Sequence, residues 1–124
     1  MIRKLAPMLP VADIGAACAF LEACFGMRAI VRLEGYAECA SGDVELRLVR
    51  APPDADMEDP ARQLVLCLDV EDVDALYARH RGAFDALPPG HLRPPFDQPY
   101  GRRELHAIHG PFLFVAAHEI ERAA

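Results

Sequence analysis

The chain has 124 residues, 52% of them hydrophobic, and a formal net charge of −6, which fits a single domain with a packed core. It contains neither a Lys- or Arg-rich run nor an apolar run of the roughly 20 residues needed to span a bilayer, so we expect no nucleic-acid or membrane partner. The prolines that follow Lys4 do not suit a signal peptide, and we expect a cytoplasmic protein.

The first half of the chain predicts a strand, a helix and three further strands. Residues 4–11 are extended and interrupted by prolines, and Asp13 can then cap a helix by accepting hydrogen bonds from free N–H groups. Gly26 ends this helix, and its apolar stripe is formed by Ile14, Cys18, Leu21 and Phe25. Glycine-containing turns separate the three strands expected next, which cover residues 28–33, 36–40 and 44–50.

The second half repeats this pattern after a linker. Residues 51–61 are rich in proline and acidic residues and have almost nothing to bury. A strand over residues 62–70 follows, and Asp72 caps a helix whose stripe is Val73, Leu76, Tyr77 and His80. A proline-rich segment over residues 91–100 then leads into a last hairpin, with strands at 102–108 and 112–118 around His109-Gly110.

A short sequence repeat indicates that the two halves are copies. Val11-Ala12-Asp13-Ile14-Gly15-Ala16 recurs as Val70-Glu71-Asp72-Val73-Asp74-Ala75, and each copy lies between a strand-like and a helix-like run. We therefore predict one α+β domain, residues 1–124, made of two βαβββ-type modules at about 1–50 and 62–120. Their strands are expected to form one curved mixed sheet, with helices on the outer face and a ligand-binding cup on the other.

Strand alternation predicts which side chains face this cup. In residues 44–50, Val44, Leu46 and Leu48 form the apolar set that is expected to face the helix, and in the last strand Leu113 and Val115 are expected to do the same. The predicted cup lining combines aromatic, acidic, basic and apolar side chains: Tyr36, Glu38, Glu45, Arg47, Val49 and Phe114. This mixture suits a polar aromatic ligand, but it equally suits a solvated groove in which Glu45 and Arg47 pair with each other.

The four cysteines lie in apolar stretches and form no C-x-x-C pair. We expect all of them, Cys18, Cys24, Cys39 and Cys67, to be reduced core residues.

Three motifs in the chain resemble those of one known family. They are Leu9-Pro10-Val11-Ala12-Asp13-Ile14 with Phe25-Gly26-Met27 behind it, the repeat that begins at Val70, and Asp97-Gln98-Pro99-Tyr100-Gly101-Arg102-Arg103-Glu104-Leu105. The last looks like the QPWG-REF signature of bleomycin-resistance proteins. Over nearly its whole length, the chain thus resembles the vicinal oxygen chelate (glyoxalase, bleomycin resistance protein and dioxygenase) superfamily, and most of all its metal-free bleomycin-resistance branch.

Enzymes of that superfamily hold a divalent metal at four positions on the lining strands. The resemblance carries these positions onto Ala6 (or Met8), Glu45, Val65 and Phe114, of which only Glu45 has ligand atoms. Catalytic sites mostly need at least three protein donors. Histidine does not complete the set, because His106 has the parity of Ile108 and is expected to face the helix layer. The expectation is that the protein uses no metal and no other cofactor.

The resemblance also implies a function. The metal-free branch consists of homodimers that sequester a large cationic glycopeptide, and its stacking aromatics correspond to Tyr36 and Tyr100. Arg47 stands where that branch has an aromatic residue and favours a carboxylate or phosphate over a cation. We expect a homodimer that binds a small amphipathic or aromatic molecule, such as an antibiotic or a toxic metabolite.

The alternative function is catalytic. A glyoxalase-like lyase, a dioxygenase-like enzyme or a metal-free acid–base catalyst would use Glu45 as its base, with a pKa raised by partial burial in the cup.

Overall fold

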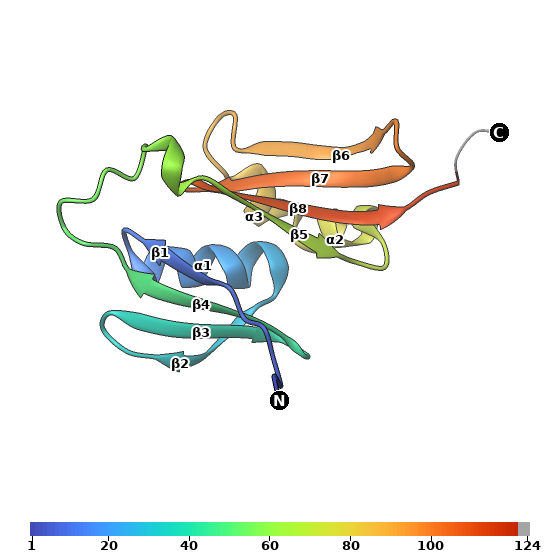
Figure 1. The fold of residues 1–124 in the computed structure, drawn as a ribbon. Helices are drawn as coiled ribbons and strands as arrows, with labels where there is room; N and C mark the ends of the chain where they lie inside the picture. Colours follow the sequence, from blue (N-terminus) through green and yellow to red (C-terminus); the bar gives the residue numbers. More distant parts are fainter. Residues whose placement is uncertain (122–124) are drawn as a thin grey trace. The chain divides into compact units, whose positions relative to one another are not determined.

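The chain forms two compact units in a computed structural model that describes residues 1–121 (Figure 1). The units are Met1–Met57 and Glu58–Ala124, so the boundary falls within the expected linker. Each unit contains a four-stranded mixed sheet. The predicted α+β fold of two βαβββ modules is therefore confirmed, with the strands divided between two sheets where one continuous sheet was expected.

The first unit consists of one helix and four strands. In chain order these are β1 (Met8–Val11), α1 (Ile14–Phe25), β2 (Arg28–Arg32), β3 (Tyr36–Ser41) and β4 (Val44–Arg50). The strand order is β1-β4-β3-β2. The β1–β4 pair is parallel and the other two pairs are antiparallel, so β1 and β2 form the edges of this sheet.

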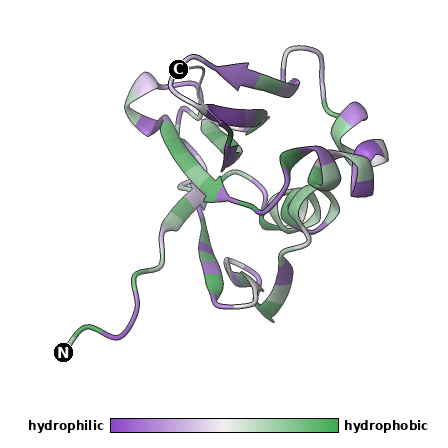
Figure 2. Cartoon of the chain, turned by 90° about the vertical axis from the view of Figure 1, so that its right-hand side faces the viewer, coloured by the Kyte–Doolittle hydropathy of each residue, from purple (hydrophilic) through white to green (hydrophobic). Residues whose placement is uncertain are grey.

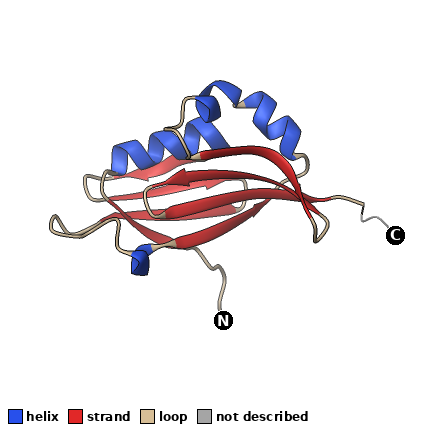
Figure 3. Cartoon of the chain, turned by 90° about the horizontal axis from the view of Figure 1, so that it is seen from above, coloured by secondary structure: helices blue, strands red, loops and turns tan. Residues whose placement is uncertain are grey.

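Helix α1 begins and ends where the sequence predicts. The Asp13 carboxylate accepts a hydrogen bond from the backbone N–H of Ala16 at 3.0 Å, and Gly26 ends the helix at φ 67° in the left-handed conformation that glycine tolerates. The helix lies along one face of the strands (Figure 3). Of the set predicted to face the helix, Leu46 and Leu48 are buried, whereas Val44 at the start of β4 is 51% exposed. Hydrophilic and hydrophobic residues alternate along the strands as purple and green bands in Figure 2.

The second unit repeats the plan with a divided helix. Its elements are η1 (Pro60–Arg62), β5 (Leu64–Asp69), α2 (Val73–Arg79), α3 (Arg81–Asp85), β6 (Leu92–Gln98), β7 (Arg102–His109) and β8 (Phe112–Glu119). The strand order is β5-β8-β7-β6, with β5 and β8 parallel. Asp72 caps α2 by accepting from the N–H of Ala75 at 3.1 Å, as Asp13 caps α1.

Strand β6 occupies the segment that the sequence analysis described only as proline-rich. It contains Pro94 and Pro95, which lack a backbone N–H and are confined to sheet edges and bulges. Both conditions are met here, because β6 is an edge strand and its pairing with β7 shifts register between Arg93 and Phe96.

The predicted facing of β8 is wrong by one residue. Phe114 is 2% exposed and pairs with Leu66 and Ala107, which are also buried. On the neighbouring strand β7, Arg103 binds Asp74 of α2. Every second residue of a strand lies on the same face, so Ala107, four residues after Arg103, also faces the helices. Phe114 therefore lies on the helix-facing side of the sheet. The error arose because β8 is apolar on both faces, which removes the alternation that identifies a buried side.

The cysteines divide into two environments. Cys18, Cys24 and Cys39 are buried as predicted, whereas Cys67 is exposed on β5. The Sγ atoms of Cys18 and Cys39 lie 3.8 Å apart, and burial raises the pKa of Cys39 to about 12. None of the helices in residues 1–121 has both the length and the hydropathy to cross a membrane.

Candidate functional site

The face of the first sheet opposite α1 carries five of the predicted site residues. The pairs Tyr36 with Val49 and Glu38 with Arg47 lie side by side on β3 and β4, and Glu45 is two residues before Arg47. The residues that alternate with them along the two strands, such as Ala37 and Leu48, are buried on the face of the sheet that packs against α1. We refer to the surface formed by Tyr36, Glu38, Glu45, Arg47 and Val49 as the first open face.

Glu45 is held by two cations on this surface. Arg47 Nε donates to its Oε2 at 2.9 Å, and Lys4 Nζ donates to its Oε1 at 3.3 Å. The Glu45 side chain is only 8% exposed, yet the hydrogen bond from Arg47, aided by Lys4, outweighs burial and lowers the pKa of Glu45. The expectation of a raised pKa was wrong, and an ionised, doubly paired carboxylate is a weak general base.

Tyr36 and Arg47 present polar groups in addition to these pairs. The Tyr36 hydroxyl donates to Glu38 Oε2 at 2.6 Å, which raises the pKa of Tyr36 and keeps the phenol protonated. The Arg47 side chain is 39% exposed, and Glu45 uses only its Nε. Its two terminal nitrogens form no hydrogen bond with the part of the chain that the structure describes, so they can bind a carboxylate or phosphate.

Tyr100 belongs to the second unit and is positioned by a tight turn. The N–H of Gly101 donates to the carbonyl of Gln98 at 3.1 Å, with Pro99 at the second position, where proline is favoured. Gly101 has φ 84°, a conformation that only glycine adopts at little cost. The turn brings the Tyr100 hydroxyl to Glu104 Oε2 at 2.7 Å and leaves half of the tyrosine exposed.

Glu104 is at the centre of a polar cluster that the sequence analysis did not identify. Besides Tyr100, it accepts a hydrogen bond from Gln98 Nε2 at 3.0 Å and lies 2.8 Å from His106 Nε2. The residue is 5% exposed. Burial alone would raise its pKa, but the hydrogen bonds from Gln98, His106 and Tyr100 outweigh burial and lower the pKa of Glu104.

The position of His106 corrects a second sequence prediction. Leu105 and Ala107 are fully buried and share the parity of Arg103, which reaches α2. Glu104 and His106 therefore project from the opposite face of the second sheet, not toward the helices. The alternation of Glu104, His106 and Ile108 with buried neighbours was the available signal, and the shifted reading of the last hairpin concealed it.

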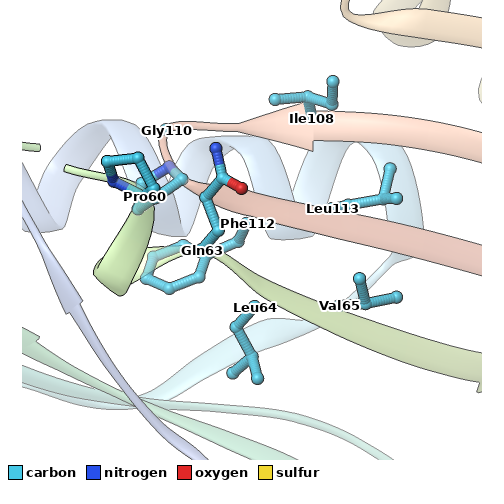
Figure 4. A pocket seen from close by; sticks show the side chains of 9 residues that line it. Pro60, Gln63, Leu64, Val65, Ile108, Gly110, Phe112 and Leu113 are labelled. Carbon is cyan, nitrogen blue, oxygen red and sulfur yellow. The ribbon is translucent and has the colours of Figure 1, made fainter. Parts of the chain in front are cut away.

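An apolar hollow of about 560 Å³ lies beside this cluster, entirely within the second unit (Figure 4). Val65, Leu113 and Ile108 project from three neighbouring strands to the same side. The remaining lining is Pro60, Gln63, Leu64, Gly110, Pro111 and Phe112. Phe114 is not part of this lining.

The four positions that the resemblance assigns to a metal do not fit one. Ala6 (or Met8), Val65 and Phe114 have no ligating atom of the required kind, and both oxygens of Glu45 are engaged by Arg47 and Lys4. Among residues 1–121, no three His, Cys, Asp or Glu side chains are grouped closely enough to hold a metal ion.

Comparisons with known proteins agree with this fold. Residues 5–114 match a family model described as Glyoxalase/Bleomycin resistance protein/Dioxygenase superfamily. Two solved structures superpose with a TM-score of 0.74 at 20% identity: a bleomycin resistance determinant encoded on the transposon Tn5, covering 95% of this chain and 98% of that one, and a bleomycin-binding protein in complex with bleomycin, covering 95% and 99%. A glyoxalase/bleomycin resistance protein/dioxygenase from Nocardioides superposes with a TM-score of 0.73 at 19% identity, covering 99% and 87%. No curated protein matches the sequence.

Proposed function

The chain belongs to the glyoxalase/bleomycin resistance protein/dioxygenase superfamily, and from this premise we propose that it is a metal-free protein that binds and sequesters a small amphipathic or aromatic molecule. The observation that carries the proposal is the first open face, where the aromatic Tyr36 on β3 and the partly exposed side chain of Arg47 on β4 project from the same side of the sheet. Such a surface recognises a ligand by stacking and charge without supplying an activated nucleophile or base.

The proposed ligand-binding residues are those of the first open face in the first unit and, as a separate contact in the second unit, Tyr100. The ring of Tyr100 is half-exposed, while its hydroxyl is fixed by Glu104. A fixed, exposed ring suits stacking, because little conformational entropy is lost when a ligand binds. Phe114 is omitted, since a side chain that is 2% exposed and faces the helices cannot contact a ligand.

Arg47 defines the charge of the ligand. Two structural relatives are described as complexes with bleomycin or copper(II)-bleomycin. In this chain, a guanidinium with free terminal N–H groups favours a carboxylate or phosphate and repels a cation. We therefore propose an anionic or neutral aromatic ligand.

The catalytic alternative loses its proposed base. Glu45 is ionised and bound by two cations, which lowers its pKa instead of raising it, and removing a proton from a substrate would require breaking these pairs. Binding without turnover is accordingly the function that the geometry supports best.

A thermal-shift screen tests the proposal. Chelator-treated protein is heated with a panel of aromatic antibiotics and aromatic carboxylates, with bleomycin as the reference compound. Because ligand binding to the native state raises the apparent stability, we expect at least one anionic aromatic compound to raise the melting temperature. Arg47→Ala should abolish that shift, while Arg50→Ala, on the same strand but with the opposite parity, should retain it. A panel in which every shift survives Arg47→Ala would refute the proposed site.

A further inference from the structure

We propose that the second unit has a ligand position of its own, in which His106, held by Glu104, accepts a hydrogen bond from a phenolic hydroxyl whose aromatic ring lies against the apolar hollow. The inference rests on the proposed binding function and names a chemical class for the ligand. It is carried by the pairing of the strands, by the contacts of the imidazole and by the hollow beside it.

Strand pairing aligns His106 with the hollow. His106 pairs with Val115 on one side and with Arg93 on the other, and Val115 pairs with Cys67. The adjacent row on the same face consists of Val65, Leu113 and Ile108, which line the hollow. Residues two apart on a strand are separated by about 7 Å, the span of one aromatic ring with its hydroxyl. A ring in contact with the hollow can therefore reach His106 with a polar substituent.

The contact with Glu104 fixes which nitrogen of His106 is available. A carboxylate can only accept hydrogen bonds, so the proton between the two residues is on Nε2, which lies 2.8 Å from Glu104 Oε1. In the neutral ring, Nδ1 is then an acceptor. Nδ1 forms no hydrogen bond with residues 1–121, and the side chain is 23% exposed. His106 thus offers one oriented acceptor beside the apolar row of Val65, Leu113 and Ile108.

Two neighbours favour a phenol over other donors. The ring of Phe96 meets the imidazole edge-on at 5.0 Å, and the Arg93 guanidinium lies 3.4 Å from the centroid of the Phe96 ring. When the phenol donates its hydrogen to Nδ1, negative charge develops on the phenolic oxygen. If the proton transfers completely, the O–H bond breaks and an N–H bond forms. Arg93 then stabilises the phenolate and Glu104 stabilises the imidazolium.

The charged and titratable groups around His106 do not oppose this arrangement. Glu104 has three hydrogen-bond partners, and Arg102 is paired with Asp69 and lies near Glu119. The other groups on the same face are the hydroxyl of Tyr100, which binds Glu104, the exposed thiol of Cys67, and Arg93. Arg93 is the cation nearest to the row of His106, and it disfavours a cationic ligand.

The test uses 4-nitrophenol, whose phenol and phenolate forms differ in colour, and 4-nitroanisole, which has a similar shape but no hydroxyl. We expect the protein to bind 4-nitrophenol about five- to tenfold more tightly than 4-nitroanisole, which corresponds to the net contribution of one hydrogen bond. We also expect the protein to lower the pKa of the bound phenol. His106→Phe should remove the preference and Arg93→Gln should reduce the pKa change. His80→Asn, at the end of α2, should change neither.

A second measurement does not depend on the folding of the variants. In nitrogen-15 NMR spectra of the unmodified protein, 4-nitrophenol should shift the Nδ1 signal of His106 and 4-nitroanisole should not. Equal affinity for the two compounds, no binding at millimolar concentration or an unmoved Nδ1 signal would overturn the inference. If these results occur while a thermal-shift ligand still depends on Arg47, the proposed function stands and only the phenol position fails. If 4-nitrophenol depends on His106 but no ligand depends on Arg47, the first open face is the part that fails.

Discussion

Glu104 is an acidic residue whose burial is balanced by three hydrogen bonds. Replacing it with glutamine removes the charge and leaves one donor facing another, so we expect Glu104→Gln to lower the free energy of unfolding by about 1 to 3 kcal/mol at pH 7. Urea unfolding followed by circular dichroism measures this change. Glu71→Gln, at an exposed position, is the matched control and should have little effect.

The lowered pKa of Glu104 predicts that the stability of the protein depends on pH in the acidic range. The pKa of Glu104 is lowered from 4.5 in the folded protein, so its contribution is fully present above pH 4.5 and is lost as the pH falls through the folded-state pKa. Unfolding curves of the parent and Glu104→Gln should therefore converge on acidification. Curves that keep a constant separation from pH 7 to pH 3 would show that the ionised carboxylate is not what stabilises the cluster.

Two substitutions at Tyr100 distinguish the contribution of its ring to ligand stacking from the contribution of its hydroxyl to the structure. Tyr100 is half-exposed, so Tyr100→Ala should weaken binding of an aromatic ligand roughly tenfold, and it also removes one of the three hydrogen bonds to Glu104. Tyr100→Phe keeps the ring but loses the hydrogen bond to Glu104, and it should retain most of the affinity. Calorimetric titration of the three proteins with one screening ligand makes the comparison. Unchanged affinity in Tyr100→Ala would remove this residue from the site.

At the scale of elements, β8 provides the sharpest test of which side chains face the helices. Phe114 is 2% exposed on the helix-facing side, whereas Leu113 is partly exposed on the opposite side. Phe114→Ala should therefore cost about 3 to 5 kcal/mol of stability, and Leu113→Ala distinctly less. Thermal and urea unfolding measure both variants. A larger loss of stability in Leu113→Ala would show that Leu113 faces the helices, as expected from the sequence.

The elements also show what local sequence can and cannot predict. Helix α1 and the start of α2 were predictable because Asp13, Asp72 and Gly26 act on the backbone beside them. Strand β6 was missed because its prolines disfavour an internal strand, and only the sheet order shows that it is an edge. The Glu104 cluster was missed because its members come together through a turn and a strand register. Pro99 and Gly101 encode the turn locally, whereas the facing of His106 was misassigned together with that of β8.

At the scale of the whole molecule, we predict a homodimer. Strand β1 is an edge strand of its sheet, and Met8 on it is 52% exposed. An apolar edge strand invites pairing with another chain unless it is covered, and a symmetric dimer covers it. Sedimentation equilibrium at micromolar concentration should give twice the chain mass. Met8→Lys, which places a charge on this edge, should shift the equilibrium toward the monomer, and a parent protein that sediments as a monomer would contradict the prediction.

The measurement that tests the central claim most directly is calorimetric titration of chelator-treated protein, shown by elemental analysis to be metal-free, with the strongest ligand from the thermal-shift screen. The account predicts saturable, stoichiometric binding, recovery of the ligand chemically unchanged, and the same affinity after zinc, nickel or manganese is added. Binding that appears only after a metal is restored, or conversion of the ligand into a product, would contradict it.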